Sequence, residues 1–260
     1  MSAGSPLRPL ADAAAADWLA EALPEFRGRV VDLATALFPS YARIFHRPDQ
    51  GLPSDDRPAT WQSIARARGT VFHPAAQFTD LARAASVPVD DQAPGPMVGS
   101  LDRLTLPLLH DHLARHTATP STCWFAQWVG SGVTAGRWSL DLAFTGLPGG
   151  PYWLFGAALG DVVDLSIDLA NSGSDGPRQE TLRRMGLVHS PTIWWPQDRA
   201  WVVHSSFDHD STIVGGEPSL VQALVDDPAI EALPVDRDVS LYANGDRING
   251  SYPSGWPQPG

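Results

Sequence analysis

Hydrophobic residues recur at helical spacing through the N-terminal part of the chain. Trp18, Leu19 and Leu23 fall near one face of a helical pattern. Thr60 is a favourable N-cap residue for a second helix, and Gly69 is a residue at which that helix stops. The spacing predicts helices over residues 9–37, 61–69, 75–85 and 101–117, with a short strand over residues 40–46.

The pattern changes after residue 121. Short runs rich in tryptophan and β-branched residues now alternate with clusters of glycine and proline, which is typical of strands. They predict strands over residues 121–130, 137–144, 151–155 and 199–207. A helix is predicted over residues 156–170, and another over residues 219–235 that Pro228 breaks.

Helices mostly before residue 120 and strands mostly after it predict an α+β fold, with a helical N-terminal part and a mixed or antiparallel sheet in the C-terminal half. Residues 86–99, rich in proline and glycine, form the strongest linker candidate. We therefore expect a mainly helical region 1–90 and a sheet-containing region 91–250, or one continuous domain that includes both. Residues 251–260 are expected to be a flexible tail.

Composition excludes several kinds of chemistry. All 18 basic side chains are arginine, because the sequence contains no lysine. A Walker phosphate loop and a pyridoxal phosphate Schiff base both need a lysine, so neither is possible, and no cofactor is predicted. The single cysteine, Cys123, forbids an intrachain disulfide, and its hydrophobic surroundings predict a buried core residue.

The net charge of −11 favours a protein partner over nucleic acid. Nucleic-acid binding depends on basic patches that neutralise phosphates, so we expect none. No segment has the roughly 18 consecutive apolar residues of a membrane span, and the N-terminus lacks the apolar core of a signal peptide. We expect a soluble, cytoplasmic protein with no membrane contact, whose partner would present a basic surface.

Two motifs suggest ligand sites but have simpler interpretations. GSGVTAG at residues 130–136 lacks the helix that a dinucleotide fingerprint requires, so we expect a hairpin loop. His112 and His116 lie four residues apart on a predicted helix, a spacing that can bind metal. The glutamate of a zinc-protease motif is missing there. We therefore expect packed histidines at the edge of the core and no metal site.

The densest aromatic stretch lies in the C-terminal third of the chain. Its candidate binding residues are Trp194, Trp195, Asp198, Arg199 and Trp201. An arginine on a tryptophan face gains roughly 0.5–2 kcal/mol from cation–π attraction. This set predicts either an aromatic-walled pocket with a salt-bridged arginine or a rigid structural corner.

Polar side chains alternate along the strand that follows this stretch. His204, Ser206, Asp208 and Asp210 share one face if the chain stays extended. A histidine and two carboxylates could bind a cation or carry acid–base chemistry, so His204, Asp208 and Asp210 are the candidate catalytic residues. The alternative is the solvated face of an antiparallel strand that ends in a turn over residues 208–211.

Several segments resemble an uncharacterised actinobacterial protein family: SPTIWWPQDRAWVV, the later STIVGG and IEALPV, and YARIFH near the start. In that family SPxxWWPxDRAW is followed by a strand, TxVGG and a helix, and the resemblance spans residues 38–250. It implies a soluble cytoplasmic protein with no assigned activity. The sequence departs from the family at His46-Arg47-Pro48 and at Ser206, where the family often has an acid. If that acid were catalytic, this chain would be impaired.

Two functions fit these observations. The first is an acidic, non-enzymatic binding module of the immunity or regulatory type, which holds a protein partner on the tryptophan wall. The second is a metal-assisted hydrolase that uses His204, Asp208 and Asp210. The chain carries no G-x-S-x-G elbow, metal-binding cysteine pair or paired-glutamate signature, so the enzymatic function is the less favoured of the two.

Overall fold

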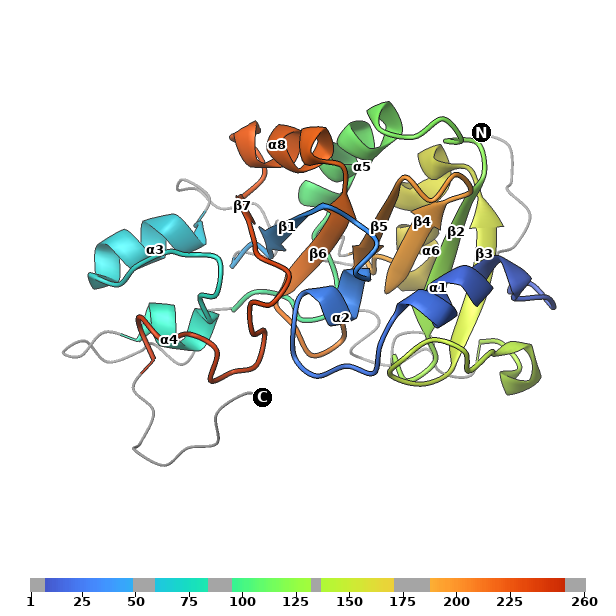
Figure 1. Ribbon diagram of the computed structural model, residues 1–260, viewed down its shortest axis with the longest axis horizontal. Helices are drawn as coiled ribbons and strands as arrows, with labels where there is room; N and C mark the ends of the chain where they lie inside the picture. Colours follow the sequence, from blue (N-terminus) through green and yellow to red (C-terminus); the bar gives the residue numbers. More distant parts are fainter. Residues whose placement is uncertain (1–7, 49–58, 84–94, 132–136, 171–187, 251–260) are drawn as a thin grey trace.

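The computed structural model describes residues 8–48, 59–83, 95–131, 137–170 and 188–250. One β-sheet runs through the middle of this structure, and helices lie on both of its faces (Figure 1). Neighbouring strands are antiparallel and follow the order β3-β2-β4-β5-β6-β1-β7. The strands are β1 (Ser40–Phe45), β2 (Cys123–Trp128), β3 (Tyr152–Ala157), β4 (Ile193–Pro196), β5 (Trp201–His204), β6 (Ser211–Gly216) and β7 (Ala232–Pro234).

Helices cover both faces of the sheet and one end of β1. They are α1 (Asp17–Ala22), α2 (Val31–Ala34), α3 (Trp61–Arg68), α4 (Phe78–Ala82), α5 (Thr105–Arg115), α6 (Val162–Ala170) and α8 (Pro218–Asp226). On one face α5, α6 and α8 pack with Trp194 and Val203. On the other face, in front of the sheet in Figure 1, α1 packs with Trp195 and α2 with Ile213. The last two, α3 and α4, pack around Phe45.

The predicted α+β class with an antiparallel sheet is confirmed, but the helices are not concentrated in the N-terminal part. Of the four longest helices in the described residues, α5, α6 and α8 follow residue 100. Conversely, β1 comes from the N-terminal part and occupies an inner position between β6 and β7. Both sides of the expected boundary near residue 90 therefore contribute strands to the same sheet.

Local capping signals set the bounds of α3 where the sequence predicts them. The Thr60 hydroxyl accepts a hydrogen bond from the Ser63 N–H at 3.0 Å, and the Thr60 N–H donates to the Ser63 hydroxyl at 3.0 Å. This reciprocal pair satisfies N–H groups that the start of a helix leaves unpaired. Gly69 ends the helix with a φ of 70°, a left-handed conformation that glycine adopts without strain.

The predicted strand over residues 137–144 is wrong. These residues contain a 3-10 turn, Leu140–Leu142, and only an isolated bridge between Phe144 and Tyr152. The side chains of Leu140 and Leu142 are exposed. The alternation that suggested a strand therefore does not mark a face that packs on the core.

Two predicted helices are shorter than their hydrophobic patterns. In the C-terminal part, α8 ends at Asp226, and after Pro228 the chain extends into β7, which pairs with β1. The predicted helix over residues 9–37 is divided into α1 and α2, with Pro24 and Gly28 between them. Gly28 has a φ of 84°, which a helix cannot contain. Backbone chemistry at proline and glycine thus overrides the side-chain pattern.

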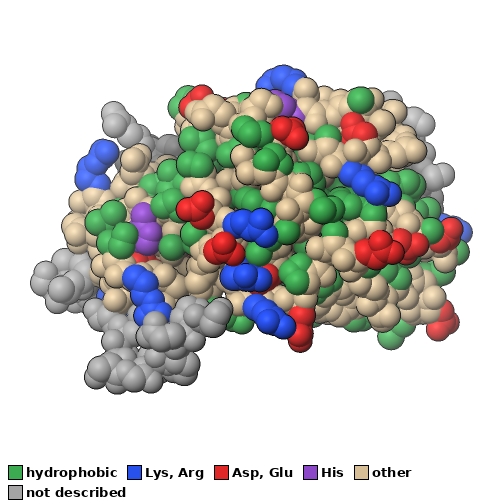
Figure 2. Space-filling view, viewed as in Figure 1, with side chains coloured by type: hydrophobic (Ala, Val, Ile, Leu, Met, Phe, Trp, Pro, Cys, Tyr) green, Lys and Arg blue, Asp and Glu red, His purple; other side chains and the backbone are tan. Residues whose placement is uncertain are grey.

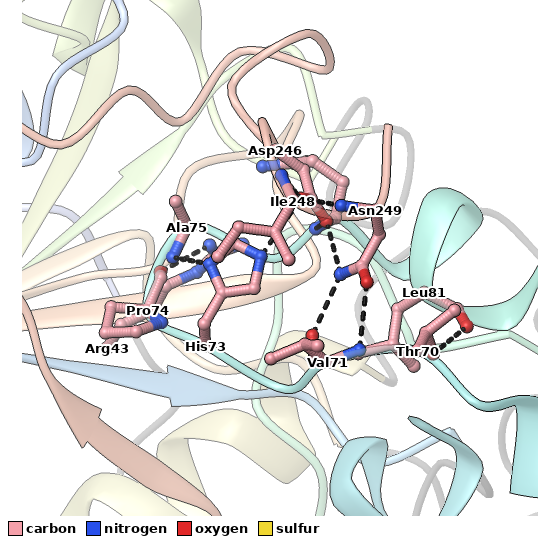
Figure 3. A network of polar contacts seen from close by, with 11 residues as sticks. Arg43, Thr70, Val71, His73, Pro74, Ala75, Leu81, Asp246, Ile248 and Asn249 are labelled. Carbon is pink, nitrogen blue, oxygen red and sulfur yellow. Dashed lines mark hydrogen bonds and ion pairs between the residues drawn. The ribbon is translucent and has the colours of Figure 1, made fainter. Parts of the chain in front are cut away.

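A buried aspartate ties the C-terminal end of the described chain to the segment before α4 (Figure 3). Asp246 accepts hydrogen bonds from the His73 ring at 2.9 Å and from the N–H groups of Ile248 and Asn249 at 3.0 and 2.8 Å. The Asn249 amide in turn pairs with both backbone groups of Val71. Burial opposes ionisation of Asp246, but these hydrogen bonds outweigh it and lower the pKa of the carboxyl.

Several expectations fall outside the described residues: most of the linker candidate 86–99, positions 132–136 of GSGVTAG, and the tail 251–260. Within the ranges that the structure does describe, no helix is long and apolar enough to cross a membrane. Cys123 in β2 is buried, which confirms its predicted place in the core, and burial raises the pKa of its thiol to about 12.

Candidate functional site

The hairpin of β4 and β5 places the three clustered tryptophans inside the molecule. Because side chains alternate along β4, Trp194 packs on the face of α5, α6 and α8, while Trp195 packs on the face of α1. Trp201 meets Trp194 edge to face, with ring centroids 5.6 Å apart. All three indoles are at most 1% exposed. The interpretation of these residues as a partner-contacting wall is therefore wrong, since they form core on two sides of the sheet.

Asp198 lies in the exposed turn between β4 and β5 and braces the loop that follows α5. Its carboxylate accepts hydrogen bonds from the Thr117 hydroxyl at 2.8 Å and from the Ala118 N–H at 2.6 Å. Its own N–H donates to the Thr119 hydroxyl at 3.0 Å. Burial opposes ionisation, but these bonds outweigh it, so the pKa of Asp198 lies below its usual value. In the described structure Asp198 serves this loop and not the expected salt bridge to Arg199.

Arg199 stands at the tip of the same hairpin in a strained backbone conformation. Its φ is 57°, in the left-handed region that residues other than glycine usually avoid. The Arg199 N–H closes the turn by donating to the Pro196 carbonyl at 2.9 Å. The guanidinium lies 5.0 Å from the centre of the Trp18 ring, and Trp18 packs edge-on against Trp195 at 6.3 Å. Buried Trp195 thus supports a surface tryptophan that carries an exposed arginine.

A cleft of about 470 Å³ opens beside this arginine–tryptophan pair, and we call it the Trp18–Arg199 cleft. Its wall combines α1, the α2–β1 connection, the end of α5, the β4–β5 turn and the start of α8. The main lining residues are Trp18, Leu37, Phe38, His116, Arg199 and Glu217. Figure 2 shows the face of the molecule with α1 and α2, where hydrophobic side chains gather among charged ones. The cleft therefore combines apolar surface with charges of both signs.

Two glycines of β6 allow apolar residues of the cleft to approach the sheet. A Cβ atom at Gly215 would lie 2.8 Å from the Phe38 ring and 3.1 Å from the Ala34 carbonyl oxygen. A Cβ atom at Gly216 would lie 2.9 Å from the Leu220 side chain. Phe38 and Leu220 both line the cleft. The paired glycines of the STIVGG segment thus help to shape its floor.

A second cleft, also of about 470 Å³, shares Phe38 and Pro39 with the first. Tyr41 and Arg237 are among its other lining residues. The two clefts therefore adjoin at Phe38 and Pro39. Each contains one exposed arginine, Arg199 in the first and Arg237 in the second.

The two histidines at the C-terminal end of α5, His112 within it and His116 directly after it, take different partners. His112 Nε2 lies 2.8 Å from a carboxylate oxygen of Asp227, which follows α8. The Nδ1–H of His116 donates to the His112 carbonyl at 2.8 Å. This geometry matches the packed histidines expected from the sequence. It also brings His116 to the wall of the Trp18–Arg199 cleft.

The three candidate catalytic residues do not form one site. His204 is buried, its Nδ1–H donates to the Leu33 carbonyl of α2 at 2.8 Å, and burial lowers its pKa to about 4. Asp208 is exposed in the β5–β6 turn, while Asp210 lies 3.7 Å from the guanidinium of buried Arg43. No group of three or more His, Cys, Asp or Glu residues among those described could hold a metal ion. The strand face expected to be solvated or cation-binding is instead covered at His204 by α2.

Sequence reasoning missed most residues of the cleft because they are distant along the chain. They meet because β1 pairs with β6, which places Ser40 opposite Gly216 and brings the α2–β1 connection beside the start of α8. The available signal was Leu37-Phe38-Pro39, a hydrophobic pair directly before a proline, where a helix rarely continues. Exposure of Leu37 in that position depends on the tertiary fold.

Two substitutions of Arg199 test the strain in this turn. Arg199→Gly and Arg199→Ala both remove the contact with Trp18, but only glycine adopts a φ of 57° freely. We expect Arg199→Gly to be more stable than Arg199→Ala by about 1–2 kcal/mol, the usual cost of the left-handed conformation. Urea denaturation of both variants measures the difference, and equal stabilities would show that the turn relaxes when the side chain is removed.

The chain matches no protein-family model, no curated protein and no solved structure among those compared with it. The geometry of the Trp18–Arg199 cleft is therefore the basis for assigning a function.

Proposed function

We propose that this protein is a non-enzymatic binding module of the immunity or regulatory type, and that the Trp18–Arg199 cleft holds part of a protein partner. One observation carries the proposal: Arg199 is exposed, rests on the Trp18 ring and keeps a strained backbone at the rim of a cleft. Backbone strain is concentrated at positions that serve a function, because elsewhere a residue without strain would be favoured.

The residues of the cleft are of the kinds that contribute most to protein interfaces. Arginine and tryptophan are enriched among residues whose truncation weakens binding strongly. Because Arg199 already rests on Trp18, less side-chain freedom is lost when a partner binds. Leu37 is 66% exposed, and covering its side chain would gain about 25 cal/mol per Å² of apolar surface.

Charge around the cleft favours a basic partner surface. Asp17 and Glu21 are both exposed and lie one helical turn apart on α1, beside Trp18. Together with the net charge of −11, they attract a basic surface and repel nucleic acid. A cytoplasmic location, with no membrane contact, is part of the same proposal.

Site-specific photocrosslinking in the native cell tests this proposal. A photoreactive residue replaces Leu37 in the cleft or, as a matched control, Leu140 on the 3-10 turn before β3. These side chains are 66% and 68% exposed. We expect position 37 to capture one discrete protein and position 140 to capture none of it. Arg199→Gln should reduce the capture, and Arg66→Gln on α3, which also removes an exposed charge, should not.

The salt dependence of the same crosslink provides a second measurement. In cell extract we expect a higher yield at low ionic strength, because the screening length is about 10 Å at 0.1 M salt and shortens as salt is added. Equal capture at positions 37 and 140, or capture at neither, contradicts the proposal.

A further inference from the structure

We infer that the Trp18–Arg199 cleft binds an extended segment of a basic protein in which an acidic side chain lies next to a basic one, and that Arg199 holds the carboxylate. This inference rests on the proposed function and specifies the chemistry of the bound segment. Four features of the cleft lead to it: the unpaired charge of Arg199, the position of Glu217, the acidic residues of α1 and the exposed apolar residues.

The guanidinium of Arg199 has no carboxylate within 4.0 Å among the described residues. Its sequence neighbour Asp198 is engaged by Thr117 and Ala118. The guanidinium carbon lies over the Trp18 ring at 5.0 Å from its centre, so Trp18 holds the side chain while its N–H groups have no carboxylate partner in the described structure. Arginine binds carboxylates through paired N–H donors in one plane, and the contact with Trp18 limits the positions that this guanidinium can take.

Glu217 supplies the opposite charge in the same cleft. It precedes α8, is exposed, and makes no side-chain capping bond to that helix. Since it also lies beyond ion-pair distance from Arg199 in the described structure, the cleft presents a separate cation and anion. A segment with adjacent acidic and basic side chains matches both. The exposed carboxylates of Asp17 and Glu21 on α1 lie beside the cleft. They favour further basic residues on either side of the bound segment.

The apolar residues indicate a stretch of polypeptide and not a small anion. A free carboxylate would satisfy Arg199 but would leave Leu37 and Phe38 uncovered at the same cleft. An extended segment can place an apolar side chain there while its charged neighbours reach Arg199 and Glu217. One bound segment then covers the apolar side chains of the cleft and also pairs with the charges of Arg199 and Glu217.

Selection from a displayed library of random octapeptides tests this chemistry without knowledge of the native partner. With the full-length protein as bait, we expect enrichment of peptides in which Asp or Glu adjoins Lys or Arg. The best peptide and its Glu→Gln or Asp→Asn version are then titrated by fluorescence anisotropy. The neutral peptide should bind wild type about tenfold more weakly, which corresponds to one good charged pair.

The same two peptides titrated against protein variants show whether Arg199 is the carboxylate's partner. Against Arg199→Gln, which should melt close to wild type, the two peptides should differ by less than about twofold. Arg199→Lys keeps the charge but loses the planar donors, so we expect an intermediate difference. Arg66→Gln should retain the full tenfold difference.

Other outcomes overturn the inference. These are failure to enrich any peptide, enrichment of purely basic or purely apolar peptides, and an equal loss for the neutral peptide in wild type and Arg199→Gln. Concentration-dependent self-association that Arg199→Gln abolishes would assign the cleft to a second copy of this chain and would also overturn it. If the peptide results fail while the Leu37 crosslink persists, the proposed function stands and only this chemistry is wrong. If the crosslink alone fails, the cleft binds such segments but the proposed cellular partner is wrong.

Discussion

Lowering the pH from 7 to 4.5 should unfold this protein, because four histidines are held neutral in the folded state. Burial lowers the pKa to about 4, against 6.5 for an ordinary histidine, in each of His46, His189, His204 and His209. The unfolded chain therefore binds more protons than the folded protein between these values. The contribution of these histidines to the free energy of unfolding is fully present above pH 6.5. It is lost progressively as the pH falls from 6.5 toward 4.

The expected loss is large compared with the stability of a domain. A pKa difference of this size corresponds to about 3 kcal/mol for each histidine, and domains are stable by roughly 5–15 kcal/mol in total. Burial is the chief reason that the pKa of His46 is low, and it outweighs the hydrogen bond to Met97, which acts in the opposite direction. In the neutral ring Nδ1–H donates to the Met97 carbonyl at 2.6 Å and Nε2 accepts from the Thr212 hydroxyl at 2.8 Å. A proton on Nε2 would remove that acceptor.

Neighbouring charges modify this acid sensitivity. The positive charge of Arg43 lowers the pKa of His209 further, after burial itself. Asp210 acts in the opposite direction, because burial raises its pKa and its protonation therefore favours the folded state. Burial raises the pKa of Glu231 as well, but two carboxyls do not offset four histidines, so the net change remains a loss of stability on acidification.

Urea denaturation at pH values from 7.5 to 4.5 measures this effect. His204→Asn is the informative variant, because the asparagine amide can still donate to the Leu33 carbonyl but does not titrate. We expect its stability to depend less steeply on pH than that of wild type. His110→Asn on α5 removes a partly exposed imidazole and serves as the control. A slope equal to wild type in His204→Asn would show that His204 is not one of the groups that take up protons.

The elements that the sequence predicts well are those with local signals at both ends. Thr60 and Gly69 mark α3, and their capping chemistry acts within a few residues whatever the tertiary fold. By contrast, β4 and β6 are buried on both faces, so Trp194-Trp195 and Ile213-Val214 show no alternation of hydrophobic and polar residues. Period-two reasoning could not find such strands, because it assumes one solvated face.

The candidate site is only partly accessible to sequence reasoning for a related reason. The sequence identifies Arg199, but the tryptophan beneath it is Trp18, almost two hundred residues away, and not one of its neighbours in the motif. Alternation along β5 separates Val202 and His204 from Trp201 and Val203, but it does not say which face a helix will cover. In the folded protein, helices cover both faces of the sheet at β5. His204 is therefore a core residue.

Trp201→Ala should destabilise the protein strongly. The Trp201 side chain is fully buried under α5, its Nε1–H donates to the Leu113 carbonyl at 3.2 Å, and its ring packs edge to face with that of Trp194. Removing a buried tryptophan ring costs about 3–5 kcal/mol, chiefly through the cavity that remains. For a chain of this length the melting temperature should then fall by about 10 °C. A variant that melts within a degree or two of wild type would contradict this packing.

Two further variants separate structural support from partner contact. Trp201→Phe keeps a ring in place, and the Leu113 carbonyl still accepts the His116 N–H at 3.0 Å, so its loss of stability should be smaller than that of Trp201→Ala. Trp18→Ala removes a half-buried ring and should cost less stability than Trp201→Ala. At temperatures where all variants are folded, however, Trp18→Ala should weaken capture at position 37 more than Trp201→Ala does. The reverse order would mean that the buried tryptophans govern binding, and the cleft would then not be the contact surface.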